Sequence, residues 1–188
     1  MNLGNSYVIE IQAFFVCAGL MIKRKIYEII IMAKIVLISC VSKKKETKGV
    51  PIEAKDLYVS SLFKKALKYA EMLEPDRVHI LSAEHHLLAL DDKVEKYNKT
   101  LNNMSADECK QWGQVVLNVL KSEGSDLERD EFILLAGDKY CKYILGEHGI
   151  KQGCQVYKEK GLKGIGHILH FFHKPLVSTK KVDTSEIL

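Results

Sequence analysis

The chain has 188 residues, which is enough for one domain to bury a sizeable core without disulfide or metal support. Hydrophobic residues make up 47% of it, a share that excludes a disordered or fibrous protein. The net charge of +4 is modest, so the composition permits a nucleic-acid partner without requiring one.

The cysteines and the first residues bear on where the protein works. The five cysteines are widely spaced and form no Cys-x-x-Cys pair, so we expect neither a disulfide framework nor a zinc site, and a cytoplasmic location. An apolar stretch over 13–22 carries its positive charges after it, unlike a signal peptide, and is too short to span a bilayer. We therefore expect no membrane association. We expect residues 1–33 to be an extension outside the fold, for which a misassigned start codon is one explanation.

Strands and helices alternate in the first half of the remaining chain. Residues 35–39 are aliphatic and apolar on both faces, which predicts a strand buried in a parallel sheet. A polar loop over 43–55 follows, and then Ser60 or Ser61 is the predicted N-cap of a helix over 62–73. Residues 77–82 predict a second buried strand, after which we expect a long loop to Asn103.

The second half continues the alternation. Ser105 and Glu108 form a capping-box pattern that opens a helix to Lys121. Its predicted buried face consists of Cys109, Trp112, Val115, Val116, Val119 and Leu120. Further predicted elements are a strand over 131–137, a helix from there through 145, a strand over 154–157 and a helix over 167–173. Residues 34–174 are thus predicted to form a single three-layer α/β domain with a mostly parallel central sheet of about four strands, followed by a polar tail at 175–188.

Polar and cationic side chains follow the first predicted strand, at Ser39, Cys40, Ser42 and Lys43. Ligands bind beyond the carboxyl ends of the strands in open α/β sheets. Neighbouring lysines can activate a Cys40 nucleophile, but no general base is identifiable in the sequence. Hydroxyls and turn amides beside lysines equally suit a phosphate or carboxylate, so we favour ligand binding. A packed, unreactive Cys40 and a plain solvated basic loop are the competing interpretations.

Three other segments are candidates for binding or catalysis. Ser82 is followed by Glu84, His85 and His86, which supply acid–base groups or form an ordinary surface loop. Glycines at 161, 164 and 166 let backbone amides approach an anion, although the order of a dinucleotide-binding motif is missing. Histidines at 167, 170 and 173 share a helix face, but their apolar neighbours favour an amphipathic helix over a metal site. We expect no metal and no cofactor.

Six ordered segments together carry a resemblance to a known family: 37–43, 54–66, 80–88, 97–101, 134–140 and 161–166. Over about residues 34–172 the sequence resembles the bacterial, archaeal and phage family catalogued as domain of unknown function 6884. That family is similar in its strand-end motifs to YaaA-like peroxide-stress proteins and to the uracil-glycosylase-like domain of archaeal tRNA-modifying enzymes. The resemblance implies a uracil-glycosylase-like fold and a nucleobase or nucleic-acid setting, with anti-phage DNA glycosylases as suggested neighbours.

The chain departs from the family pattern at two positions. The family usually has Lys-His-Gly-Leu where this chain has Glu84-His85-His86-Leu87, so a histidine replaces the glycine. It usually has Tyr-Asp where this chain has Tyr97-Asn98. An asparagine cannot act as a base, so Asn98 is limited to orienting water or hydrogen-bonding a nucleobase.

The lead hypothesis is an N-glycosylase-like enzyme that cleaves the bond to a base, modified or not, in nucleic acid, with DNA favoured over RNA, in defence against foreign DNA. His85 would donate to the departing base, Asn98 would position water, and Tyr58 or Tyr97 would stack on the extruded base. The lysines within 43–48 and 64–68 would follow the backbone. The expected substrate- and phosphate-binding set is Ser39, Cys40, Ser42, Lys43, Tyr58, Ser82, Tyr97, Gly137, Gly164 and Gly166. A non-catalytic nucleic-acid-binding stress protein and an enzyme of small nucleotides are the alternatives.

Overall fold

The computed structural model describes residues 32–172. The expected amino-terminal extension, apart from its last two residues, and the expected polar tail lie outside the described residues. So does His173, the last of the three histidines considered for a metal site.

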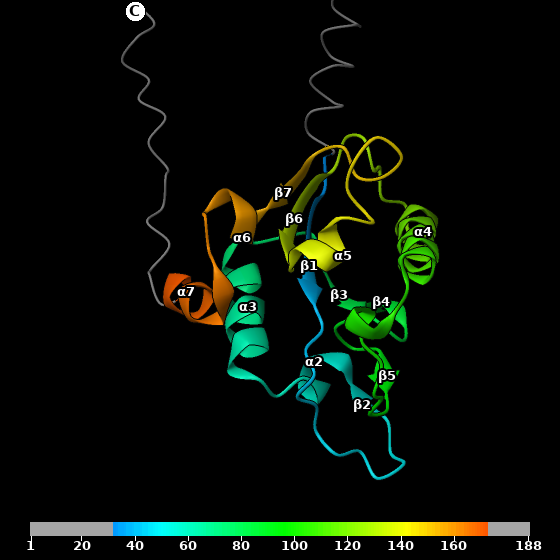
Figure 1. The fold of residues 1–188 in the computed structure, drawn as a ribbon, viewed down its shortest axis with the longest axis vertical. Coiled ribbons are helices and arrows are strands. Elements are labelled where there is room, and N and C mark those ends of the chain that lie inside the picture. Colours follow the sequence, from blue (N-terminus) through cyan, green and yellow to red (C-terminus); the bar gives the residue numbers. More distant parts are fainter. Residues whose placement is uncertain (1–31, 173–188) are drawn as a thin grey trace, which may run out of the picture. The chain divides into compact units, whose positions relative to one another are not determined.

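A five-stranded sheet, in the order β4-β3-β1-β6-β7, forms the centre of the domain (Figure 1). The parallel strands are β1 (Lys34–Ser39), β3 (Arg77–Ser82), β6 (Glu131–Leu135) and β7 (Gly153–Gln155). β4 (His86–Ala89) runs antiparallel to β3 at the sheet's edge. The predicted α/β class and mostly parallel sheet are confirmed, with five strands rather than four.

The predicted long loop over 83–103 is wrong, because the chain turns back after Ser82 and forms β4. The apolar pair Leu87 and Leu88 is buried there. The turn contains no glycine, proline or asparagine, which are common turn residues, so nothing in the sequence signalled a turn or the strand after it. Three short elements also occupy stretches expected to be loop: β2 (Ile52–Glu53) pairs antiparallel with β5 (Lys93–Val94), and η1 (Leu101–Asn103) follows.

The two long helices begin directly after the N-cap residues that the sequence predicted. α3 (Ser61–Met72) follows Ser60, whose hydroxyl accepts a hydrogen bond from the Phe63 amide at 3.1 Å. α4 (Ala106–Ser122) begins with the predicted capping box: Glu108 N donates to Ser105 Oγ at 3.2 Å, and Ser105 N donates to Glu108 Oε2 at 2.7 Å.

The buried face of α4 differs from the prediction at two positions. Val115 is 38% exposed and Val119 is half-buried, whereas Gly113 and Leu117 are buried. The buried residues follow the helical period from Cys109, and Val115 falls on its far side. A Cβ at Gly113 would collide with the backbone of Tyr143, so this glycine permits a close approach between the helix and a loop.

The shorter helices are α2 (Ala54–Leu57), α5 (Asp138–Cys141), α6 (Val156–Glu159) and α7 (Gly164–Phe171). α5 is a single turn and does not reach residue 145 as predicted. The strand predicted over 154–157 is divided between β7 and α6. α7 starts three residues earlier than predicted, since its first turn includes Gly164 and Gly166.

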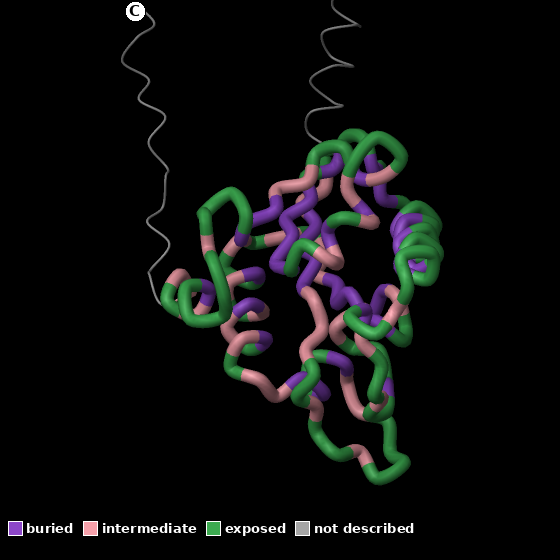
Figure 2. The backbone as a smooth tube through the Cα atoms, in the orientation of Figure 1, coloured by how far each residue is buried: buried purple, intermediate pink, exposed green. Residues whose placement is uncertain are grey.

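The sheet is covered on both faces, which gives three layers. Figure 1 shows α3, α6 and α7 on one side of the sheet and α4 on the other. Val36 and Ile38 pack toward the α3 side with Phe63 and Ala66, and the alternating residues of the strand face the other side. In Figure 2 the strands are buried and the outer helix faces are exposed. Within residues 32–172, no helix is both long and apolar enough to cross a bilayer.

Candidate functional site

A pocket of about 110 Å³ opens where β1 ends. Three segments enclose it: the exit of β1, the stretch before η1, and α5. The residues that line it, here named the β1 pocket, are Cys40, Val41, Ser42, Lys44, Asn98, Lys99, Thr100 and Tyr140. A pocket thus lies at the carboxyl end of β1, where the sequence placed the candidate site and where α/β folds bind ligands.

The lysine that faces the pocket is Lys44 rather than Lys43. Residues 43–45 run as an extended segment beside Tyr58, with hydrogen bonds from Lys45 N to Leu57 O at 2.8 Å and from Val59 N to Lys43 O at 3.2 Å. Alternate residues of an extended segment point to opposite sides. Lys43 and Lys45 are therefore exposed, while Lys44 is half-buried in the pocket wall.

The ammonium group of Lys44 lies over aromatic rings. Its Nζ is 4.1 Å from the ring centroid of Tyr97 and 5.7 Å from that of Tyr58, a cation–π arrangement. Burial lowers the pKa of Lys44; the nearby Cys40 opposes this shift, and Lys96 adds to it. Lys44 therefore releases a proton more readily than an ordinary surface lysine.

Ser82 organises a buried hydrogen-bond network beneath the pocket. Its hydroxyl accepts from the amides of Glu84 and His85, at 3.2 and 2.9 Å, and donates to the Tyr97 hydroxyl at 2.9 Å. The hydroxyls of Tyr97 and Tyr58 are 2.7 Å apart. Burial raises the pKa of both tyrosines, so both phenols stay neutral and the network fixes the Tyr97 ring under Lys44.

Tyr58 cannot stack on an extruded base in this arrangement. The residue is 1% exposed, and its ring packs on Phe63 at 4.9 Å between centroids. Tyr97 is half-buried: Lys44 lies over its ring, and His85 meets it in a T-shaped contact at 5.2 Å. Both tyrosines lie under Lys44 and outside the pocket lining, so they support Lys44 instead of offering a free ring face.

Tyr140 and Trp112 close the pocket on the α4 side. The Tyr140 hydroxyl lies 3.1 Å from Cys40 Sγ, and burial raises the pKa of Tyr140. Its ring packs against Trp112 at 5.5 Å in a T-shaped contact. The Trp112 indole N–H donates to the backbone carbonyl of Ser82 at 2.7 Å. One core residue thus supports both the Ser82 turn and the Tyr140 wall.

The remaining predicted site residues fall in three places. Ser42 and Asn98 are exposed and line the β1 pocket. His85 is exposed beside Tyr97 but outside the pocket lining, and Ser39 and Lys43 are also outside it. The glycines lie apart from the pocket: Gly137 and Gly164 line a second hollow, and Gly166 is exposed on α7.

The sequence did not single out Lys44, Thr100, Trp112 or Tyr140 as site residues. The sequence contained a clue to two of them. Tyr140 ends one of the six segments that carry the resemblance, and in an extended 43–45 the side chain of Lys44 points to the opposite side from its neighbours. Among the residues that the structure describes, no carboxylate lines the β1 pocket. Among residues 32–172, no three His, Cys, Asp or Glu side chains are grouped to hold a metal ion.

The sequence model of the family of unknown function DUF6884 matches residues 35–174, which is most of the chain. The chain belongs to DUF6884. No curated protein matches the chain, and neither does any solved structure. The residues of the β1 pocket all fall inside the segment that the DUF6884 model matches.

The backbone at His86 bears on one expectation from the resemblance. At this position, where the resemblance leads us to expect glycine, φ is 64°. The left-handed region costs a residue with a Cβ about 1–2 kcal/mol and costs glycine little. The turn between β3 and β4 therefore favours glycine for conformational reasons, and the histidine in this chain carries strain.

Proposed function

We propose that this DUF6884 protein is an N-glycosylase-like enzyme that releases a base, modified or not, from nucleic acid. DNA is the favoured substrate and defence against foreign DNA the proposed setting. The observation that carries the proposal is the half-buried Lys44 ammonium in a small pocket of hydrogen-bonding side chains without a carboxylate. The strand-end motifs, which resemble those of YaaA-like and uracil-glycosylase-like domains, support it and suggest a uracil-glycosylase-like fold.

The size of the β1 pocket suits one extruded base. Pockets for drug-sized ligands measure about 300–1,000 Å³, and the β1 pocket measures about 110 Å³. It is too small for a whole dinucleotide. Enzymes that act on a base in a polymer turn that base out of the stack and enclose it alone.

The charge of the pocket suits the departing base. When the bond between C1′ and the base nitrogen breaks, its electron pair moves to the base and positive charge builds on the sugar. The Lys44 ammonium would stabilise the negative charge on the base and, with its lowered pKa, donate a proton to it. Asn98 and Ser42 at the rim supply hydrogen bonds to the base edge.

Water attack would follow bond cleavage. Since no carboxylate lines the pocket, we assign no general base there; Asn98 and Thr100 would orient a water molecule toward C1′, and its proton would leave to solvent. His85 lies outside the lining, so we transfer the role of donor to Lys44 and propose that His85 contacts the flanking nucleotide.

Base release from oligonucleotides tests this proposal. The full-length protein would be incubated with DNA and RNA strands, each unmodified or carrying one modified base, and the products examined for alkali-labile abasic sites and for the free base. We expect abasic sites in at least one DNA substrate. Salt-dependent binding without abasic product would instead support a non-catalytic nucleic-acid-binding protein. Hydrolysis of mononucleotides alone would support an enzyme of small nucleotides.

A further inference from the structure

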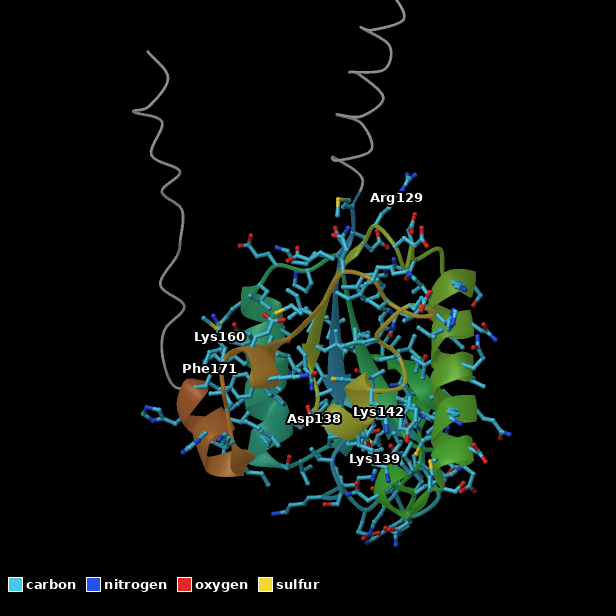
Figure 3. The ribbon with its side chains drawn as sticks, turned by 45° about the horizontal axis from the view of Figure 1, so that its top comes forward. Arg129, Asp138, Lys139, Lys142, Lys160 and Phe171 are labelled. Atoms are coloured by element: carbon cyan, nitrogen blue, oxygen red, sulfur yellow. The ribbon has the colours of Figure 1, made fainter. Side chains whose placement is uncertain are left out.

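Beside the β1 pocket, two larger hollows adjoin across α5 and α6. They measure about 630 and 390 Å³ and share Asp138 and Lys158 in their walls. We name them together the α5 groove. Lys139 and Lys142 line the first hollow and Lys163 the second. Figure 3 shows Asp138, Lys139 and Lys142 gathered at α5.

The α5 groove has a surplus of positive charge. Four lysines line it with a single carboxylate, Asp138. That carboxylate is held at the wall, because Gln155 Nε2 donates to its Oδ1 at 2.6 Å and Gln155 is buried. Within residues 32–172, none of the four lysines forms an ion pair.

Some lysines elsewhere on the surface are paired with carboxylates. Lys55 and Lys93 share Glu53, at 2.8 and 2.9 Å, and Lys99 lies 3.5 Å from Glu84. The four groove lysines have no carboxylate partner among the described residues, and what sets them apart is that they gather in two adjoining hollows; Lys142 Nζ also lies 5.4 Å from the ring centroid of Tyr143. A row of ammonium groups along an elongated hollow complements a chain of phosphates, which gains affinity by releasing its counterions.

The single turn of α5 connects the groove to the β1 pocket. Tyr140 lines the pocket, while its neighbours Lys139 and Cys141 line the groove. A strand that placed one base in the pocket would therefore have the groove beside it. The combined hollows exceed what one phosphate fills, which favours a polymer over a free anion.

We propose that the α5 groove binds the phosphodiester backbone of the nucleic acid whose base enters the β1 pocket. Only the second half of this statement rests on the proposed function; the binding of backbone by the groove does not. Lys142, Lys158 and Lys163 are exposed and are the residues expected to contact phosphates.

A matched pair of triple variants tests the groove. The first is Lys142→Gln/Lys158→Gln/Lys163→Gln. The control removes the same charge from exposed lysines outside both hollows, as Lys110→Gln/Lys121→Gln/Lys151→Gln. Binding of a labelled DNA duplex of about 20 base pairs would be measured by fluorescence anisotropy between about 50 and 200 mM salt, with inorganic phosphate and a mononucleotide as competitors.

We expect the groove variant to weaken duplex binding at least about 30-fold near 100 mM salt and to reduce the salt slope by about 2–3, because each lost phosphate contact removes nearly one unit of slope. The control variant should change the dissociation constant less than about threefold, since scattered surface charge contributes little. Replacing the three groove lysines by arginine should restore binding, which shows that the groove variant failed through charge and not through misfolding.

Equal weakening by both glutamine variants would overturn the inference, as would unchanged binding by the groove variant or no salt-dependent binding by the wild-type protein. Competition by mononucleotide or inorganic phosphate as strong as by the duplex would also overturn it, since the groove would then take a free anion. If the wild-type protein releases base but the groove variant binds the duplex normally, the proposed function stands and the inference about the groove is wrong. If binding depends on the groove lysines but no base is released, the groove inference stands and the proposed function is wrong.

Discussion

The β1 pocket and the α5 groove lie on either side of one helical turn and are built in opposite ways. The pocket is small, and buried hydrogen bonds among Ser82, Tyr97 and Tyr58 fix the two rings that lie under its Lys44. The groove is larger and is lined by exposed lysines without carboxylate partners among the described residues. In the proposed function, the fixed pocket would select among bases, and the exposed lysines of the groove would supply affinity for any sequence. On that proposal, selection and affinity are carried by different parts of the protein and can be separated by mutation.

The pocket and the groove should differ most in their effect on stability, because the residues that support the pocket from behind belong to the core. Trp112 is 2% exposed and contacts both Ser82 and Tyr140. We expect Trp112→Ala to lower the free energy of unfolding by about 4 kcal/mol, through the cavity and the unpaired Ser82 carbonyl. Urea unfolding followed by circular dichroism measures it. Val115→Ala, on the exposed face of the same helix, should stay within about 0.5 kcal/mol. Similar losses in both variants would contradict the assignment of the α4 faces.

Removing the hydroxyl of buried Ser82 should destabilise the protein more than removing the hydroxyl of exposed Ser42. Ser82→Ala removes the acceptor of two backbone amides and one of the two hydroxyl partners of Tyr97, which keeps Tyr58, so we expect a loss of about 2 kcal/mol. Ser42→Ala at the exposed rim should change the free energy of unfolding by less than about 0.5 kcal/mol. The same urea titration compares them. If the two serines proved equivalent, the buried network would not hold the pocket.

The smallest effect is expected at the turn that enters β4. At a φ of 64°, glycine avoids the Cβ strain that both histidine and alanine suffer. We expect the free energy of unfolding of His86→Gly to be about 1 kcal/mol higher than that of His86→Ala. Both variants lose the imidazole, and they differ only in the Cβ. Thermal unfolding of the two variants measures the difference. The opposite order would show that the left-handed conformation is not retained in solution.

The sequence predicted the features that depend on local chemistry. The apolar run over 35–39, the Ser60 cap and the Ser105–Glu108 capping box each determine their own element and were found. β4 was missed, because its turn depends on a strained His86 and not on a recognisable turn residue. The mostly parallel α/β class followed from the order of the elements, whereas the fifth strand and the small β2–β5 sheet required tertiary pairing.

A pocket lies where the sequence placed the candidate site, but its lining differs from the predicted set of residues. The carboxyl end of β1 was expected from fold rules, and Cys40, Ser42 and Asn98 do line the pocket there. Alternation along an extended 43–45 separates Lys44 from its two neighbours, but the pairing with Tyr58 that makes this segment extended and directs Lys44 inward is not evident from the sequence. The burial of Tyr58 and the separation of Gly137 and Gly164 from the pocket are likewise consequences of packing between distant segments.

The most direct test of the central claim compares base release by Lys44→Met and Lys45→Met. Methionine keeps an apolar stem and removes the ammonium group, and the two lysines are neighbours of which only Lys44 lines the pocket. On the substrate that wild-type protein cleaves, we expect the rate of Lys44→Met to fall at least about 100-fold, the usual effect of losing a charge-stabilising group. At saturating substrate, where a weaker backbone contact no longer limits the rate, Lys45→Met should stay within about threefold of wild type, because Lys45 lies outside the pocket lining. A Lys44→Met protein that is folded and releases base at the wild-type rate would contradict the account.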